Sequence, residues 1–193
     1  MRLRTETWRW GVAVLVAAVA VGGLAAWRLS ERLPKRFAAV VEGRLYRSGE
    51  VTAGQLERLR DEYGITRVIC LLDETAPETQ AEAAAARRLG MEWCNVSLPG
   101  NGASTAEDRR RILELLQAED SGPTLVHCAA GVNRTGLAVG LYRLHCEGWT
   151  LDQVMAELRD SDFRDLPKHE NLRAALAGEA AAAQDQAVGE AQP

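Results

Sequence analysis

The stretch "TLVHCAAGVNRTGLAVGLYRL", residues 124–144, joins a short apolar run, a loop of small residues and a helical segment. The run "PTLVHC", residues 123–128, predicts a strand, and the segment from about Arg134 to Cys146 predicts a helix. A strand that passes through a short loop into a helix is the repeating unit of an α/β fold, in which ligands bind where the carboxyl end of the strand meets the helix. The loop that follows Cys128 is therefore the first candidate site.

The same alternation of apolar runs and amphipathic segments extends along the chain. Expected strands occupy residues 65–73 and 91–98 with a hairpin-like pair at 37–49, and expected helices occupy residues 52–64 and 75–89 and the segments that start at Ser104 and Thr150. Capping boxes mark three helix starts, in the pairs Thr52 with Gln55, Ser104 with Glu107 and Thr150 with Gln153. The pattern predicts an α/β fold with a central, mainly parallel sheet of four to five strands flanked by helices.

The loop between Cys128 and Arg134 has the chemistry of an anion site. Its five residues, "AAGVN", include Gly131, which can take a positive φ and turn backbone amides toward one centre. Arg134 adds a planar fork that grips two oxygens of a phosphate. In this positive potential at a helix N-terminus, the pKa of the Cys128 thiol should fall from about 8.5 into the range of roughly 3.5–7.5. A thiolate beneath a bound phosphate can attack phosphorus in line.

The segment "HCAAGVNRTG" resembles the phosphate-binding loop of the cysteine-based protein tyrosine and dual-specificity phosphatases. The pattern of that family is His-Cys, two residues, Gly, two residues, Arg, Ser or Thr, and Gly. The similarity covers roughly residues 44–159. It includes "GRLYRSGEVTAGQLERLRDEYGITRVICLLDE", which resembles the entry segment of compact, atypical dual-specificity phosphatases, and the segment around the loop resembles bacterial members.

The resemblance implies a protein tyrosine phosphatase-like fold and a phosphoric monoester hydrolase that works through a cysteinyl-phosphate intermediate, with no metal and no cofactor. It makes Cys128 the nucleophile, Arg134 the phosphate clamp and Thr135 the hydroxyl that assists the second step. His127 would support the loop. The implied amide cradle comprises Ala129, Ala130, Gly131, Val132, Asn133 and Arg134.

The general acid expected from the resemblance is missing at its usual place. Family members place an Asp on a loop about thirty residues before the Cys, but here that region, "NVSLPGNGAST", holds neither Asp nor Glu. Asp73 and Asp108 are comparable candidates, and Glu107 is a third, although Glu107 and Asp108 also suit a helix N-terminus. Without an acid, the enzyme should favour substrates with good leaving groups, such as aryl phosphates.

The variable positions of the loop limit the range of substrates that we expect. Relatives that act on phosphoinositides or inositol polyphosphates often carry basic residues where this chain has the uncharged Ala129, Ala130, Val132 and Asn133. A loop with one Arg suits one phosphate, which favours a phosphotyrosine-type protein substrate or a small phosphomonoester. Two alternatives stay open, a lipid or small-molecule phosphomonoesterase at the membrane and a catalytically weak phosphate-binding module.

Other polar and sulfur-containing residues have weaker claims on function. By resemblance, Arg47 and Ser48 in "YRSG" line the pocket, although a surface turn fits the sequence equally well. His145 and His169 have no spaced partner that would indicate a metal site. Three further cysteines, Cys70, Cys94 and Cys146, read as free thiols, and a reversible disulfide of Cys70 or Cys94 with an oxidised Cys128 is the alternative.

The amino-terminal region has a different composition. Residues 10–27 hold eighteen uncharged residues between Arg9 and Arg28, with tryptophans at both ends, and would span roughly 27 Å as a helix. We interpret them as a single-pass transmembrane helix, between a basic tail (1–9) and a juxtamembrane linker (28–36). A cleaved signal peptide and a buried helix are the alternatives. Flanking positive charges favour a cytoplasmic catalytic domain.

The remaining segments are acidic and soluble in character. The predicted phosphatase domain covers residues 37–177 and a flexible tail covers 178–193. Residues 37–193 carry 16 Lys and Arg against 25 Asp and Glu, a net charge of −9, while the whole chain has −4. This charge makes nucleic acid an unsuitable partner.

Overall fold

The computed structural model describes residues 18–19, 32–118 and 122–190. Its centre is a five-stranded mixed sheet in the order β1-β2-β5-β3-β4. The strands are β1 (Ala38–Val41), β2 (Leu45–Ser48), β3 (Arg67–Cys70), β4 (Glu92–Asn95) and β5 (Thr124–His127). Strand β1 pairs antiparallel with β2, while β2, β5, β3 and β4 run parallel to one another. The predicted hairpin and mainly parallel sheet are confirmed.

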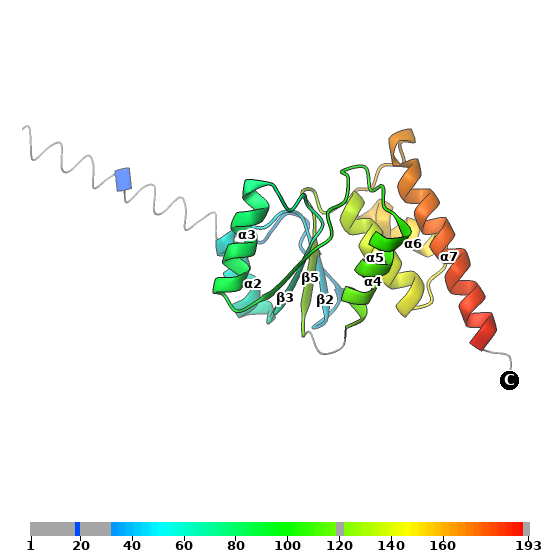
Figure 1. Cartoon of the computed structure of the whole chain (residues 1–193), viewed down its shortest axis with the longest axis horizontal. Helices are drawn as coiled ribbons and strands as arrows, with labels where there is room; N and C mark the ends of the chain where they lie inside the picture. Colours follow the sequence, from blue (N-terminus) through cyan, green and yellow to red (C-terminus); the bar gives the residue numbers. More distant parts are fainter. Residues whose placement is uncertain (1–17, 20–31, 119–121, 191–193) are drawn as a thin grey trace, which may run out of the picture. The chain divides into compact units, whose positions relative to one another are not determined.

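Helices cover both faces of this sheet, as predicted. Helices α2 and α3 lie on one side, and α4, α5, α6 and α7 lie on the other (Figure 1). Their bounds are α2 (Ala53–Tyr63), α3 (Pro77–Arg88), α4 (Ala106–Gln117), α5 (Asn133–Cys146), α6 (Leu151–Asp160) and α7 (Glu170–Glu190), with a short 3-10 helix, η2 (Pro167–His169).

Local sequence signals set most helix ends. Thr52 and Gln55 form the expected capping box of α2, and Gly64 ends that helix with φ 66°. The start of α4 differs from the prediction, because its capping box joins Thr105 to Asp108, one residue after Ser104 and Glu107. Both pairs have the same spacing, so the sequence pattern could not choose between them. The side chain of Asp108 is therefore committed to the helix cap.

Helix α5 is the centre of the core, and its residues from Thr135 to Leu144 are all buried. It packs between the sheet and the outer helices α6 and α7. A Cβ atom at Gly140 would lie 2.8 Å from Leu176 Cδ2 and 3.0 Å from Val154 Cγ1, so the missing side chain permits this close approach. The helix that leaves the candidate phosphate loop therefore packs against α4, α6 and α7 as well as against the sheet.

The chain divides into two compact units, Met1–Leu33 and Pro34–Pro193. The predicted transmembrane helix at residues 10–27 lies outside the described residues except for Ala18 and Val19. Within the described ranges, no helix has the length and apolar character needed to cross a bilayer.

Helix α7 passes through Gly178, where composition predicts the start of a flexible tail. Ala180 is buried, and the Glu179 carboxylate accepts hydrogen bonds from Arg109 Nε (2.6 Å) and His145 Nε2 (2.9 Å). These contacts explain the difference, because they come from α4 and α5 and cannot be recognised in the composition of the tail itself.

Candidate active site

The candidate phosphate loop connects the carboxyl end of β5 to the start of α5. Gly131 has φ 70°, and a Cβ atom there would lie 2.7 Å from backbone atoms of Ser48 and Gly49. Only glycine fits this left-handed position at such a close approach. Val132 is the N-cap of α5 and makes no side-chain capping bond. Its side chain therefore leaves the backbone N–H groups at the start of the helix available to a ligand.

Cys128 lies at the base of this loop and is only 2% exposed. Burial by itself would raise the pKa of the thiol, but the hydroxyl and backbone N–H of Thr135, the charge of Arg134 and the N–H of Gly131 together lower the pKa below its ordinary value. Thr135 is fully buried beside the sulfur. The surroundings of Cys128 therefore favour the thiolate, which is the reactive form of cysteine.

We expect Cys128 to be the thiol that reacts first with iodoacetamide at mildly acidic pH. Its pKa is lowered, whereas burial raises the pKa values of the Cys94 and Cys146 thiols. At mildly acidic pH, a larger fraction of the Cys128 thiol is therefore ionised than of the Cys94 or Cys146 thiol. Mass spectrometry of alkylated peptides across a pH series measures this order, and labelling of Cys146 before Cys128 would contradict it.

Arg134 lies at the start of α5, partly exposed, at the edge of the sheet where β3 and β4 end. Its Nη1 donates to the carbonyl oxygens of Leu71 (3.3 Å) and Leu98 (3.2 Å). These carbonyls follow the ends of β3 and β4, so the parallel strands themselves set the direction of the guanidinium. The structure thus brings Arg134, Cys128 and Thr135 together.

His127 and Glu82 form a buried pair directly behind the loop. Nε2 of His127 donates to Oε1 of Glu82 at 2.9 Å, and the same oxygen accepts from Trp93 Nε1 at 2.8 Å. Burial disfavours a charged imidazole, but contacts with Cys70 and Glu82 outweigh burial and raise the pKa of His127. The partner Glu82 was not found by sequence reasoning, because it sits in an Ala- and Glu-rich helix without a distinguishing neighbour.

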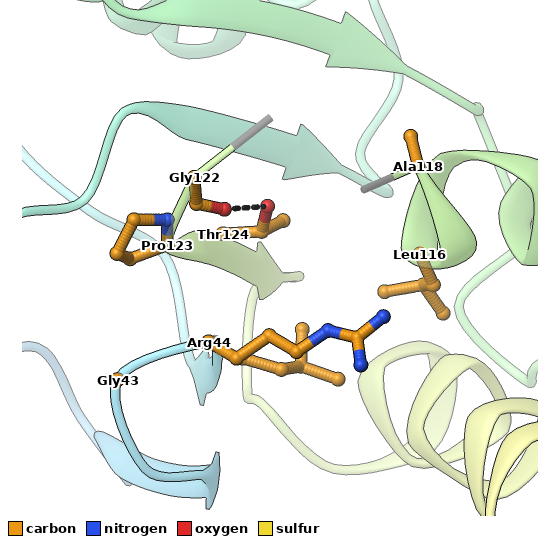
Figure 2. A pocket seen from close by; sticks show the side chains of 8 residues that line it. Gly43, Arg44, Leu116, Ala118, Gly122, Pro123 and Thr124 are labelled. Carbon is orange, nitrogen blue, oxygen red and sulfur yellow. Dashed lines mark hydrogen bonds between the residues drawn. The ribbon is translucent and has the colours of Figure 1, made fainter. Parts of the chain in front are cut away.

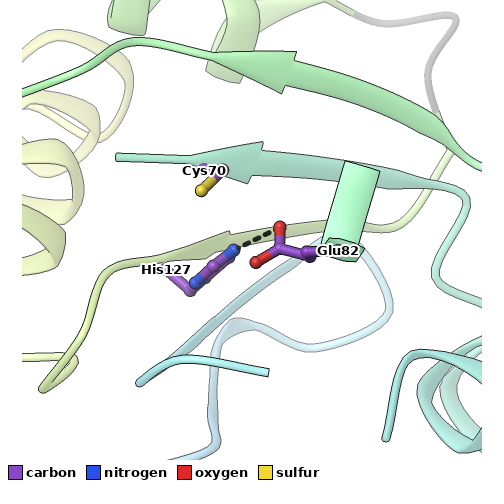
Figure 3. A group of neighbouring side chains, drawn as sticks. All are labelled: Cys70, Glu82 and His127. Carbon is purple, nitrogen blue, oxygen red and sulfur yellow. Dashed lines mark hydrogen bonds and ion pairs between the residues drawn. The ribbon is translucent and has the colours of Figure 1, made fainter. Parts of the chain in front are cut away.

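Cys70, Glu82 and His127 also offer three possible metal ligands within 4.8 Å of one another (Figure 3). Such residues could supply part of a tetrahedral site. However, the nitrogen and oxygen that would bind an ion are hydrogen-bonded to each other at 2.9 Å. The cluster has the geometry of a buried ion pair that fixes the strand end before Cys128.

The two candidate general acids are engaged elsewhere. Asp73 Oδ1 accepts from the backbone N–H and the hydroxyl of Thr75, and these bonds lower the pKa of Asp73. The Asp108 carboxylate accepts from the backbone N–H and hydroxyl of Thr105. A general acid needs a proton at working pH and reach to the leaving oxygen, and these contacts favour an ionised Asp73 and a fixed Asp108.

The remaining predicted site residues lie around the loop. Arg47 and Ser48 are buried in β2, which excludes the surface turn as their setting. Asn133 Nδ2 contacts the carbonyl of Gly100 (3.3 Å) and Nε2 of His169 (3.2 Å). His169 was missed as a neighbour of the loop, since it lies 36 positions further along the chain.

A separate hollow of about 340 Å³ lies at the opposite end of the strands (Figure 2). Thr124 and Leu45, the first residues of β5 and β2, are among its lining residues together with Arg44. Cys128 follows the last residue of β5, so this hollow is remote from the thiol. Among the described residues that line it there is no cysteine, and the hydroxyl of Thr124 donates to the carbonyl of Gly122 at 3.2 Å.

Comparison with known proteins gives both sequence and structural relatives. Residues 24–184 match a family model described as "DSP-PTPase phosphatase fused to NAD+ Kinase". Dual specificity protein phosphatase TpbA of Pseudomonas aeruginosa (strain UCBPP-PA14) is 38% identical over 72 residues, which cover 36% of this chain and 33% of TpbA. This chain thus spans about a third of that relative in the match. Inositol diphosphatase DSP4 of Arabidopsis thaliana is 31% identical over 161 residues, covering 72% of this chain and 75% of that protein.

Solved structures share the fold. The core catalytic domain of the PP-IP phosphatase SIW14 from S. cerevisiae, in complex with citrate, superposes with a TM-score of 0.63 at 24% identity and covers 73% of this chain and 85% of its own. A structure of P. aeruginosa TpbA in complex with pTyr has a TM-score of 0.59 at 22% identity. The match covers 80% of this chain and 98% of the TpbA chain.

Proposed function

This chain belongs to the family of dual-specificity phosphatases described as fused to NAD+ kinase, and from that premise we propose that it hydrolyses phosphomonoesters with Cys128 as nucleophile and without a metal. The observation that carries the proposal is the buried thiol whose pKa is lowered by Thr135, Arg134 and Gly131. The same groups that stabilise a thiolate can stabilise the oxygens of a bound phosphoryl group. A phosphate-binding module without turnover has no need for an activated thiol.

The reaction proceeds in two displacements at phosphorus. The Cys128 thiolate attacks in line, so that the S–P bond forms while the P–O bond to the leaving group breaks and the leaving oxygen takes up a proton. A water oxygen then attacks the phosphocysteine, the S–P bond breaks, and the water proton passes to solvent. The Thr135 hydroxyl, which hydrogen-bonds the sulfur, stabilises the departing thiolate, and Arg134 with the loop amides holds the phosphoryl oxygens.

We propose aryl phosphates, with phosphotyrosine as the natural example, as the preferred substrates. Two observations support this class: the commitment of Asp73 and Asp108 to other contacts, and the four uncharged variable positions of the loop. A second candidate is a phosphoanhydride, which the similarity to an inositol diphosphatase favours. Its phosphate leaving group also departs without an acid, so the leaving-group chemistry suits both classes, while the uncharged loop positions favour the aryl phosphate.

The rate of hydrolysis should depend strongly on the leaving group. With a chelator present, the protein should hydrolyse an aryl phosphate about 10²–10⁴-fold faster than an alkyl phosphate, which is the usual contribution of a general acid. Steady-state assays of a phosphotyrosine peptide, a phosphoserine peptide and an inositol diphosphate measure the preference. Equal rates on the phosphotyrosine and phosphoserine peptides would indicate that a general acid protonates the leaving oxygen. In that case the Asp73→Asn or the Asp108→Asn variant should lose activity on the phosphoserine peptide. Loss of activity with the chelator would contradict the metal-free mechanism.

We propose further that residues 10–27 anchor the enzyme in a membrane with the catalytic domain on the cytoplasmic side. The support is the uncharged run with terminal tryptophans and its basic flanks. The full chain should sediment with membranes after an alkaline carbonate wash, whereas a chain that starts at Pro34 should remain in the supernatant. Release of the full chain by carbonate would exclude a spanning anchor.

A further inference from the structure

Three consecutive carbonyl groups on the outside of the phosphate loop each accept a hydrogen bond from another part of the chain. The Ala129 oxygen accepts from the backbone N–H of Glu50 at 3.2 Å. The Ala130 oxygen accepts from Arg36 Nη1 at 3.0 Å, and the Gly131 oxygen accepts from Arg47 Nη2 at 3.0 Å. Two of the three donors are therefore arginine side chains that lie far from the loop in sequence.

These bonds determine where the amides of the loop point. In a planar trans peptide, the C=O and the following N–H point in opposite directions, and the described residues contain no cis peptide. When the carbonyls of residues 129–131 are held outward, the N–H groups of residues 130–132 are turned toward the inside of the loop. We propose that Arg36 and Arg47 are positioning residues, which keep the amide cradle open for a phosphoryl group. This inference rests on the proposed function.

Arg36 and its partner Asp162 carry the strain of this arrangement. They have φ 54° and φ 69°, and they are the non-glycine residues with positive φ in the described ranges. Their side chains join at 2.8 Å between Arg36 Nε and Asp162 Oδ2, and they are 32% and 68% exposed. Exposed ion pairs add little stability, so stability does not explain two strained residues that meet at one loop. Backbone strain of this kind is typical of functional sites.

Arg47 supports the adjacent carbonyl from a buried position. It is 5% exposed, and its Nη1 donates to Ser161 Oγ at 2.9 Å. Ser161 and Asp162 are consecutive residues at the end of α6, so a single turn holds both arginines. We call Arg36, Arg47, Ser161 and Asp162 the carbonyl clasp.

The backbone before β1 is seated against the same loop. The carbonyl of Lys35 accepts from the N–H of Gly49 at 2.6 Å, and a Cβ atom at Gly49 would lie 3.0 Å from the oxygen of Ala129. The backbone contact of Lys35 with Gly49 thus places Arg36 next to the loop. A cradle that is already open costs no reorganisation when the phosphoryl group enters, which is how preorganised donors accelerate a reaction.

The test compares Arg36→Ala with Arg58→Ala in the full chain. Arg58 is a matched control, because it is 30% exposed and forms an exposed ion pair with Glu62 on α2. The readout is the orthophosphate concentration that protects Cys128 from iodoacetamide by half. We expect this concentration to rise about tenfold or more in Arg36→Ala, with kcat/KM on an aryl phosphate falling by a similar factor. Arg58→Ala should behave as the unaltered protein.

Conservative variants separate positioning from simple folding effects. Arg36→Lys keeps the charge and should restore part of the phosphate protection, whereas Asp162→Asn, which tolerates a positive φ, should cause a smaller loss than Arg36→Ala. A lower melting temperature with unchanged phosphate protection in Arg36→Ala would overturn the clasp. Phosphate protection does not require turnover, so it decides this inference even if the unaltered protein hydrolyses no substrate and the proposed function fails.

Discussion

A Cys128→Ser protein is expected to lose turnover of aryl phosphates by at least about 10⁴-fold while it still binds them. The loop stabilises a negative sulfur through the hydroxyl and N–H of Thr135, the charge of Arg134 and the N–H of Gly131. A serine hydroxyl stays protonated in the same place and is a weak nucleophile. The amides of the cradle are unchanged, so the substrate should remain bound instead of being released as product.

Two measurements check this expectation. Steady-state assays give the loss of kcat, and capture of phosphoproteins by immobilised Cys128→Ser protein gives the retained binding. Cys146→Ser is the matched control, because Cys146 is exposed near the end of α5 and away from the loop. Turnover that survives in Cys128→Ser would eliminate the cysteinyl-phosphate mechanism.

An Arg134→Lys protein should lose about 10²–10³-fold in kcat/KM, although the positive charge is kept. The guanidinium is set by the carbonyls of Leu71 and Leu98, and its planar fork can hold two phosphoryl oxygens at once. An ammonium group is a point charge that cannot make both contacts in this geometry. Because the fork grips the phosphoryl group most tightly in the transition state, kcat should fall as well as the affinity.

Arg110→Lys provides the comparison for this substitution, since Arg110 lies on the exposed face of α4 in ion pairs with Glu107 and Glu114. Its kinetic constants should match those of the unaltered protein. Equal activity of the Arg134→Lys and Arg110→Lys proteins would remove Arg134 from the proposed phosphate clamp.

The fold was largely predictable because its signals are local. The capping boxes at Thr52 and Thr150 are each made within four residues, and the structure shows both. The pattern around Cys128 likewise contains its strand, loop and helix within one short stretch. Where two local patterns overlap, as at Ser104 and Thr105, the sequence does not distinguish them, and the structure shows the cap at Thr105.

The supporting contacts of the site could not be predicted for the opposite reason. Glu82 pairs with His127 across 45 positions, Arg47 reaches Gly131 across 84, and Arg36 reaches Ala130 across 94. No periodicity or spacing links residues that far apart. A general acid cannot be recognised from the sequence either. Its role depends on whether a carboxyl group such as that of Asp73 reaches the leaving oxygen and is not already engaged in other hydrogen bonds.

The order of the strands implies that the candidate active site unfolds in two stages. Strand β5 is hydrogen-bonded to β2 on one edge and β3 on the other, so its amides should exchange with solvent only when the whole domain opens. Arg36 precedes β1, one of the two edge strands, which pairs only with β2 in the described sheet. Edge segments of this kind open at a lower free energy than central strands. On warming, the grip on phosphate should therefore weaken while the cysteine is still enclosed, and hydrogen exchange would record two separate openings.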